Sequence, residues 1–232
     1  MGERTEIKNA KGDATADRST AADSPKNEPG RVLMTHGYGG HTLLLVPLAR
    51  RLAESGYACQ RWGYRSLWRG TEHHARRLID RLKTLDSEGA FHIVTHSMGA
   101  LVLRTALLAV RPSQLQKVVM LCPPNHGAHA ASRVKRFAGW ASPALAEISD
   151  LPDSLANRLP TNITDDYCVG TIVADGDWVV SPESTQLPGL ADSVTLPGMH
   201  SGLLFKPECA DQVAHFLQFG RFNHEVNCSA PS

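Results

Sequence analysis

The sequence contains no run of about 18 consecutive apolar residues, the length that a membrane-spanning helix needs. Its first twenty residues, MGERTEIKNAKGDATADRST, also lack the apolar core of a signal peptide. A strong excess of one charge is absent too, because 24 Lys and Arg residues stand against 23 Asp and Glu residues, for a formal net charge of +1. We therefore expect a cytoplasmic protein without stable membrane insertion, whose main partner is neither nucleic acid nor an anionic membrane.

Cysteine is sparse and scattered, at Cys59, Cys122, Cys168, Cys209 and Cys228. An odd number of cysteines without clustered spacing argues against a disulfide framework and against a zinc site. The first three fall in apolar stretches that resemble strands, where buried free thiols are common. No local feature favours a cysteine nucleophile, so the sequence predicts buried thiols.

The composition indicates one soluble globular domain with extensions at both ends. The chain has 232 residues, of which 42% are hydrophobic and 20% charged. Residues 1–29 hold almost no apolar side chain, and they predict a disordered leader because they cannot bury enough surface to offset the entropy of ordering. The domain covers 30–222, and 223–232 form a C-terminal tail.

Apolar runs alternate with helical patterns through this domain. The predicted strands cover 31–35, 57–64, 91–96, 117–122, 167–174 and 193–197, and the predicted helices cover 43–56, 71–89, 98–110 and 207–220. Strands that are apolar throughout are typical of a sheet that is covered on both faces. The sequence therefore predicts the α/β class, with a mostly parallel central sheet and helices on both sides.

The stretch 123–166 interrupts this alternation. It carries five prolines and only weak helical periodicity, and it separates two predicted core strands. A long excursion at such a point is typical of a short cap or a substrate-binding insertion. The alternative is a packing helix with loops.

Polar residues follow four of the predicted strands, at the carboxyl ends where α/β folds bind ligands. The loop His36–Gly40, with the sequence HGYGG, follows the first strand, and Ser97 follows the third. Asp175 and Asp177 follow the strand 167–174, and His200 follows the last strand. Because these ends share one edge of a parallel sheet, we expect these side chains to lie close together.

Serine, histidine and a carboxylate together can attack a carbonyl group. A serine hydroxyl is a weak nucleophile, so it needs a base such as histidine to take its proton. The histidine needs a carboxylate to fix its tautomer and stabilise the imidazolium. The oxyanion that forms needs backbone donors, and the N–H groups of Met98, directly after the serine, and of Tyr38 in the glycine loop are the candidates.

The chain from about residue 30 to 222 resembles the bacterial lipase/esterase group of the α/β-hydrolase superfamily. The match is carried by the segments LMTHGYGG, FHIVTHSMGA, VVMLCPPNHGAHA, DGDWVVSPESTQLPGLADSVTLPGMH and VAHFLQFGRF. Serine, acid and histidine also occur in the chain order of that superfamily. The elbow pattern Gly-x-Ser-x-Gly has Thr95 at its first position, where the group accepts Gly, Ala or Thr, and it retains Gly99.

The resemblance implies a role for each site residue. Ser97 becomes the nucleophile, and the context LPGMHSGLL identifies His200 as the base. In related sequences the acid precedes a segment like DWVVSPEST, which favours Asp177 and leaves Asp175 as a turn residue.

The other polar residues receive supporting roles. His36 is expected to hold the shape of the glycine loop by hydrogen bonding, and His96 is the variable residue of the elbow. Asn125 and Gly127 match a family loop near the active site, where they could shape an acyl pocket. His73 and His74 are expected to be solvated on an amphipathic helix. His126 and His129 are expected to be cap or loop residues, because no acidic partner stands at suitable spacing from them.

These observations imply a single α/β-hydrolase domain that cleaves short- to medium-chain acyl esters through an acyl-enzyme. The partner is a small-molecule acyl ester, and the reaction requires neither metal nor cofactor. A thioesterase, an amidase or an acyltransferase with the same triad remains open, as does an inactive binding module with this fold. The sequence leaves the oligomeric state undetermined.

Overall fold

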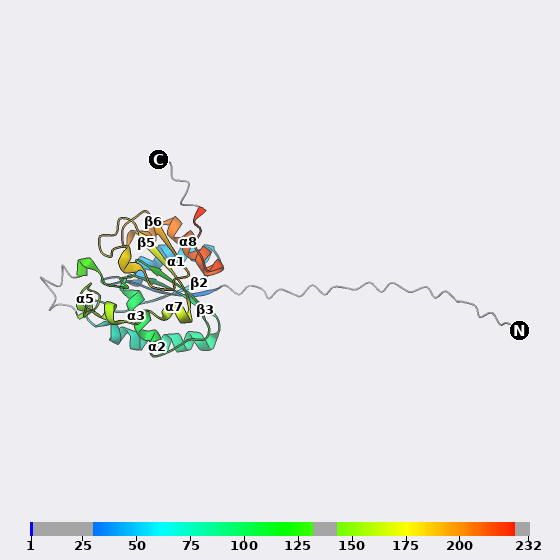
Figure 1. Ribbon diagram of the computed structural model, residues 1–232, viewed down its shortest axis with the longest axis horizontal. Coiled ribbons are helices and arrows are strands. Elements are labelled where there is room, and N and C mark those ends of the chain that lie inside the picture. The colour runs from blue at the N-terminus through cyan, green and yellow to red at the C-terminus, as the bar shows by residue number, and fades with distance from the viewer. Residues whose placement is uncertain (2–29, 132–142, 226–232) are drawn as a thin grey trace.

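The computed structural model describes residue 1 and the segments 30–131 and 143–225 (Figure 1). The predicted leader, the middle of the 123–166 stretch and most of the predicted C-terminal tail lie outside the described residues. The separate leader, cap and tail therefore stay predictions.

A single sheet with strand order β2-β1-β3-β4-β5-β6 forms the centre of the domain. Its strands are β1 (Arg31–Thr35), β2 (Ala58–Trp62), β3 (Phe91–His96), β4 (Leu115–Leu121), β5 (Cys168–Ala174) and β6 (Asp192–Leu196). All neighbouring pairs are parallel, which confirms the prediction of a parallel sheet. The chain runs from β1 outward to β2 and then returns to β3 on the other side of β1, so the strand order reverses there. Ligand sites of open α/β sheets form at such a reversal.

Helices cover both faces of this sheet, as predicted (Figure 1). One face carries α2 (Thr71–Glu88) and α3 (Met98–Leu107), which pack against each other, and the other carries α1 (Val46–Glu54) and α8 (Pro207–Phe219). Shorter helical turns are η1 (Thr42–Leu45), α5 (Pro143–Glu147), α6 (Leu155–Arg158), α7 (Ile163–Asp166), η2 (Glu183–Thr185) and η3 (Gly202–Phe205). No helix among the described residues combines the length and the apolar character needed to cross a membrane.

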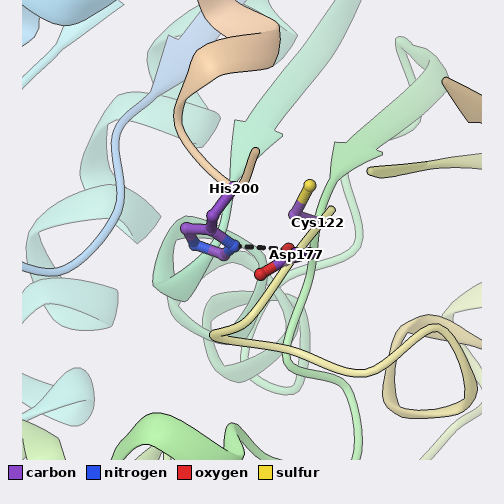
Figure 2. Close-up of side chains that lie close together, drawn as sticks. All are labelled: Cys122, Asp177 and His200. Carbon is purple, nitrogen blue, oxygen red and sulfur yellow. Dashed lines mark hydrogen bonds and ion pairs between the residues drawn. The ribbon is translucent and has the colours of Figure 1, made fainter. Parts of the chain in front are cut away.

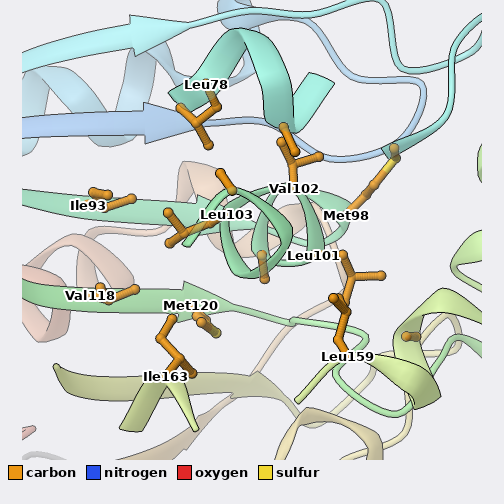
Figure 3. Close-up of a cluster of buried hydrophobic side chains, with 14 of the residues drawn as sticks. Leu78, Ile93, Met98, Leu101, Val102, Leu103, Val118, Met120, Leu159 and Ile163 are labelled. Carbon is orange, nitrogen blue, oxygen red and sulfur yellow. The ribbon is translucent and has the colours of Figure 1, made fainter. Parts of the chain in front are cut away.

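The hydrophobic core has two layers, one on each face of the sheet. Side chains of successive strand residues point to opposite faces, so each strand supplies both layers. Figure 3 shows the layer on the α2 and α3 side, where Leu78, Val102 and Leu103 pack over Ile93 and Val118. The opposite layer lies under α1 and α8 and contains Val32, Val94 and Val119 together with helix residues such as Leu48, Val213 and Phe216.

His74 is buried, which contradicts the prediction that it is solvated. Its side chain is 1% exposed, whereas that of the preceding His73 is exposed. His74 lies one helical turn before the buried Leu78, on the face of α2 that packs against the core. Its ring lies 4.6 Å from the ring of Tyr64, so the aromatic neighbour completes the apolar contact of this face.

The cysteines of the described chain are free thiols with unequal burial. Cys122 and Cys209 are buried, while Cys59 and Cys168 are only half-buried. The prediction of buried thiols is therefore wrong for these two. Cys59 lies on β2 at the edge of the sheet, and Cys168 is the first residue of β5, so both lie at the periphery of the sheet.

The described parts of the 123–166 stretch pack onto the α2 and α3 side of the domain. Ala128, Ile148 and Leu159 belong to the same core layer as those helices. In addition, Glu147 accepts a hydrogen bond of 2.5 Å from the backbone N–H of Thr71, the first residue of α2. A carboxylate at a helix N-terminus is stabilising, because the first N–H groups lack acceptors within the helix.

Arg104 of α3 connects this stretch to the helix that follows the serine. Its side chain is buried, and it donates to the backbone oxygens of Asn125, Leu159 and Pro160 and to Oδ1 of Asn125, at 3.0 to 3.2 Å. Burial lowers the pKa of Arg104 to about 10, which still leaves the guanidinium charged at neutral pH. In the described part of the chain, the hydrogen-bond acceptors of this buried cation are all carbonyl oxygens of the backbone or of the Asn125 amide.

Replacing Arg104 should destabilise the protein strongly. Arg104→Met fills a similar volume but leaves several buried oxygens without donors, which costs about 3 kcal/mol or more. We expect the thermal midpoint to fall by roughly 6 °C or more for a domain of this size. Arg111→Met is the matched control, because Arg111 pairs with Asp166 at the surface and should change the midpoint little. Equal midpoints for the two variants would contradict this role of Arg104.

Candidate active site

Ser97 lies at a sharp turn between β3 and α3, in a backbone conformation that few residues with a side chain adopt. Its φ is 53° and its ψ is −126°, and its N–H donates to the carbonyl oxygen of Leu121 at 2.8 Å. Gly99 permits this turn, because a Cβ there would lie 3.0 Å from the carbonyl oxygen of His36 and would also meet the Thr35 side chain. Thr95, at the first elbow position, is fully buried near the end of β3.

The structure brings Ser97, His200 and Asp177 into one hydrogen-bonded chain. The Ser97 Oγ lies 2.8 Å from Nε2 of His200, and Nδ1 of His200 lies 2.7 Å from Oδ2 of Asp177. Both distances are typical of good hydrogen bonds. The carboxylate accepts the Nδ1 proton, so Nε2 is free to accept the hydroxyl proton of Ser97.

Asp177 is held in place as an ionised group. Its Oδ1 accepts the backbone N–H groups of Val179 and Val180 at 2.8 and 3.0 Å. Burial by itself would raise the pKa of Asp177, but the hydrogen bond and charge of His200 and these two N–H groups outweigh it and hold the pKa below its ordinary value. The carboxylate is therefore available as a permanent acceptor for His200.

Asp175 has a different position from Asp177. Its Oδ1 accepts the N–H of Gly198 at 2.8 Å, and its own N–H donates to Leu196. These bonds join the turn after β5 to the end of β6, two residues before His200. The structure thus places Asp177 against the histidine and leaves Asp175 in the turn.

The glycine loop after β1 lies directly beside Ser97. A Cβ on Gly37 would come within 2.7 Å of the Ser97 Cβ, so only glycine permits this approach. Tyr38 follows in the loop, and Met98 is the first residue of α3, where backbone N–H groups have no acceptor within the helix. The assignment of the Tyr38 and Met98 N–H groups as oxyanion donors stays a prediction. The position of the glycine loop beside Ser97 is compatible with that assignment.

His36 shapes this loop through hydrogen bonds, as the sequence predicts. Its Nε2 accepts the N–H of Tyr64 at 3.2 Å, and its Nδ1 donates to the carbonyl oxygen of Gly37 at 2.9 Å. The Tyr64 ring stacks on the imidazole at 4.4 Å, and its hydroxyl donates to the His36 carbonyl oxygen at 2.6 Å. Burial lowers the pKa of His36, which favours the neutral ring that these bonds require.

His96 has a contact that sequence reasoning missed. Its Nε2 lies 3.1 Å from the backbone oxygen of His200, and the two rings are 5.0 Å apart. Burial, followed by the nearby charge of His200, lowers the pKa of His96 to about 3, so the ring is neutral and donates its proton to that oxygen. Only its position beside Ser97 could have indicated this role.

Because His96 is buried without charge, it should make the fold acid-sensitive. The unfolded chain binds a proton there below a pH of about 6.5, whereas the folded chain does not until a pH near its lowered pKa of about 3. The contribution of neutral His96 to the free energy of unfolding is complete above pH 6.5. It falls by about 1.4 kcal/mol per pH unit as the pH decreases toward 3. Urea unfolding at pH 7, 6 and 5 gives the free energy of unfolding at each pH. This free energy should fall less steeply with decreasing pH for His96→Gln than for the wild type, whereas the exposed His73→Gln should keep the wild-type dependence on pH.

The 123–166 stretch also contains a hydrogen-bonded pair that sequence reasoning missed. The Nδ1 of His129 lies 2.5 Å from Oδ2 of Asp150. The two residues are 21 positions apart, so the sequence spacing of His126 and His129 gave no signal for this partner. Asn125 and Gly127 connect the same region, because Asn125 donates to the Thr185 carbonyl oxygen at 2.8 Å and Gly127 adopts a φ of 97° against Asp150. A role in an acyl pocket stays a prediction for both residues.

Cys122, Asp177 and His200 together offer sulfur, oxygen and nitrogen atoms that all lie within 4.8 Å of one another (Figure 2). These are the donor types of a zinc site. A metal ion there would compete for the oxygen and nitrogen atoms that already share the hydrogen bond between Asp177 and His200.

The fold matches those of known hydrolases, although no protein-family model and no curated protein matches the sequence. The mature form of Bacillus licheniformis lipase BlEst2 is 13% identical, with a TM-score of 0.68 over 85% of this chain and 94% of that one. Aspergillus fumigatus lipase B is 15% identical, with a TM-score of 0.70 over 87% of this chain and 55% of that one. A metagenomic carboxyl esterase is 16% identical, with a TM-score of 0.61 over 75% of this chain and 65% of that one. The chain therefore has the α/β-hydrolase fold, which confirms the predicted fold class.

Proposed function

We propose that the protein is a serine hydrolase that cleaves carboxylic esters through an acyl-enzyme. The observation that carries this proposal is the hydrogen-bonded chain from Ser97 Oγ through His200 to Asp177, at the carboxyl ends of the strands. The structures similar to this one include lipases and a carboxyl esterase, which supports an ester as the bond that is cleaved.

The first half of the reaction forms the acyl-enzyme. Ser97 Oγ attacks the carbonyl carbon of the ester while Nε2 of His200 takes the hydroxyl proton. The N–H groups of Tyr38 and Met98 stabilise the oxyanion of the tetrahedral intermediate. The intermediate collapses, the bond between carbon and the leaving oxygen breaks, and His200 donates its proton to the departing alcohol.

The second half releases the acid. A water molecule gives a proton to His200 and attacks the acyl carbon, which forms a second tetrahedral intermediate at the same oxyanion donors. Its collapse returns the proton to Ser97 Oγ and frees the carboxylic acid. Every step uses the three side chains, two backbone N–H groups and water.

We infer that the substrates are short- to medium-chain acyl esters. The 123–166 stretch is short and interrupted by proline, whereas a large apolar lid is the feature that would favour long lipids. Its described parts are fastened to α2 and α3 by Glu147 and Arg104.

The test is a panel of p-nitrophenyl esters with acyl chains from two to sixteen carbons, together with a matched thioester, a matched anilide and an alcohol as acyl acceptor. We expect ester hydrolysis with a maximum at short to medium chain length. Preference for the thioester, the anilide or the alcohol acceptor would support a thioesterase, an amidase or an acyltransferase instead. The absence of turnover on the whole panel would support an inactive binding module.

A further inference from the structure

The glycine loop (residues 36–40) has a second neighbour besides Ser97, the segment 63–67 that follows β2. Strands β1 and β2 are parallel neighbours, with Thr35 opposite Trp62, so their carboxyl ends bring the two segments together. Gly63 permits the close approach, because a Cβ there would lie 2.7 Å from the Thr42 side chain, just beyond the loop. The side chains of the segment 63–67 can therefore reach the glycine loop.

Tyr64 contacts His36, the first residue of the loop, in three ways. Its N–H donates to the imidazole Nε2 at 3.2 Å, its ring stacks on the imidazole, and its hydroxyl donates to the His36 carbonyl oxygen at 2.6 Å. That oxygen belongs to the peptide that leads into Gly37, so the hydroxyl fixes the backbone as well as the ring. Burial raises the pKa of Tyr64, so the hydroxyl keeps its proton and donates at neutral pH.

Ser66 holds the other end of the loop. Its Oγ accepts the N–H of Gly39 at 2.9 Å, and its own N–H donates to the Tyr64 carbonyl oxygen at 3.1 Å. The Ser66 side chain is buried, which protects this acceptor from competing water. Tyr64 and Ser66 are thus joined to each other, and they hold His36 and Gly39 on either side of Tyr38.

These contacts decide which N–H groups of the loop remain for a substrate. The Gly39 N–H is bound by Ser66, and the Gly40 N–H donates to the Gly37 carbonyl oxygen at 3.2 Å. Within the described residues, the Tyr38 N–H has no such acceptor. A free donor between two fixed peptides satisfies the condition for a preorganised oxyanion site, since it need not reorganise during the reaction.

We propose that Tyr64 and Ser66 are positioning residues that hold the glycine loop so that the Tyr38 N–H is preorganised for the oxyanion. This inference rests on the proposed function. Neither side chain needs to touch the substrate, because both act through the backbone of the loop. The oxyanion develops only on the way to the tetrahedral intermediate, so loosening the loop lowers kcat and leaves KM nearly unchanged.

The test measures kcat and KM for Ser66→Ala and Tyr64→Phe on the p-nitrophenyl ester that the wild type hydrolyses fastest. Each variant loses one hydrogen bond to the loop, and Tyr64→Phe keeps the stacked ring. We expect kcat and kcat/KM to fall about 3- to 10-fold in each variant, the range that corresponds to one neutral hydrogen bond. The loss should stay below the roughly 10²- to 10³-fold that follows when an oxyanion donor itself is removed.

A second measurement uses two ketone inhibitors that carry the acyl chain of this ester. The carbonyl carbon of a trifluoromethyl ketone accepts Ser97 Oγ, the hydroxyl proton passes to His200, and the carbonyl oxygen becomes an oxyanion. The matched methyl ketone is less electrophilic and binds without this addition. Ser66→Ala and Tyr64→Phe should weaken inhibition by the trifluoromethyl ketone about 3- to 10-fold, and inhibition by the methyl ketone less than about 2-fold.

Ser55→Ala and Tyr57→Phe are the matched controls. Each removes a hydroxyl that donates to a backbone oxygen of a helix, that of Arg51 in α1 for Ser55 and that of Ala214 in α8 for Tyr57. Both variants should keep the wild-type kcat and the wild-type inhibition constants of the two ketones.

Three outcomes would overturn the inference alone, with the wild type active on esters. They are a wild-type kcat in folded Ser66→Ala, an equal weakening of both ketones, and an equal loss in the control variants. Thermal unfolding shows which variants are folded, and Ser66→Ala decides the test alone if Tyr64→Phe is not. A wild type that hydrolyses no ester would overturn the proposed function and this inference together.

Discussion

Ester hydrolysis by Ser97→Ala should fall to near background, with a loss in kcat on the order of a million-fold. The Ser97 Oγ is the atom that His200 Nε2 contacts at 2.8 Å, and alanine has no atom that can form the covalent bond to the acyl group. The backbone bond from the Ser97 N–H to Leu121 is unaffected by the change, so the variant should remain folded. Rates on the preferred p-nitrophenyl ester and thermal unfolding of both proteins would measure the effect.

Ser201→Ala is the matched control for this experiment. Ser201 directly follows His200, is exposed and makes no side-chain capping bond to η3, so its variant should keep nearly full activity. A Ser97→Ala variant that retains its rate would show that another group attacks the ester. A fluorophosphonate probe gives an independent readout, since it should label the wild type and the Ser201 variant but leave the Ser97 variant unlabelled.

Asp177→Asn should reduce kcat by about 10⁴-fold, whereas Asp175→Asn should change it by less than about 10-fold. The amide introduced by Asp177→Asn cannot compensate an imidazolium, and its NH₂ group can turn toward His200 Nδ1 and stabilise the tautomer that cannot deprotonate Ser97. The amide introduced by Asp175→Asn still offers an oxygen to the Gly198 N–H, so the turn before His200 is preserved. The rates of both variants on one ester at pH 7 would measure the difference.

Similar losses for the two aspartate variants would contradict this assignment and would point to a shared effect on the position of His200. A larger loss for Asp175→Asn would reverse the assignment. Thermal unfolding distinguishes either result from a general loss of structure.

The sheet was predictable because its signals are local. The inner strands β1, β3, β4 and β5 are largely apolar, and the observed bounds of all the strands differ from the predicted ones by few residues. The strand β4 begins at Leu115 rather than Lys117 and ends at Leu121, because Cys122 leaves the extended conformation. That departure could not be inferred from a run of letters that reads as a continuous strand.

The residues of the candidate site were identifiable because each follows a strand directly or within a few residues. Parallel topology alone then brings Ser97, Asp177 and His200 to one edge of the sheet. Contacts between distant segments had no such signal. The pairing of His129 with Asp150 and the closeness of Cys122 to Asp177 depend on how loops fold back over that edge.

His74 shows why helix faces are harder to assign than strands. Histidine is polar, and the residue before it is solvated, so composition favours an exposed position. His74 is buried because it lies on the same face of α2 as Leu78 and because the ring of Tyr64 packs against it. Tyr64 belongs to another segment, so the sequence around His74 could not indicate this contact.

The anchoring of Arg104 limits how this hydrolase fold can be re-engineered. The guanidinium takes its oxygens from position 125, just after β4, and from positions 159 and 160, so both ends of the insertion are tied to one cation. A segment transplanted from another protein of this fold must therefore present carbonyl oxygens at both junctions, or α3 must lose its arginine in the same design. Libraries that aim at new substrate ranges would keep these two junctions constant and vary the sequence between them.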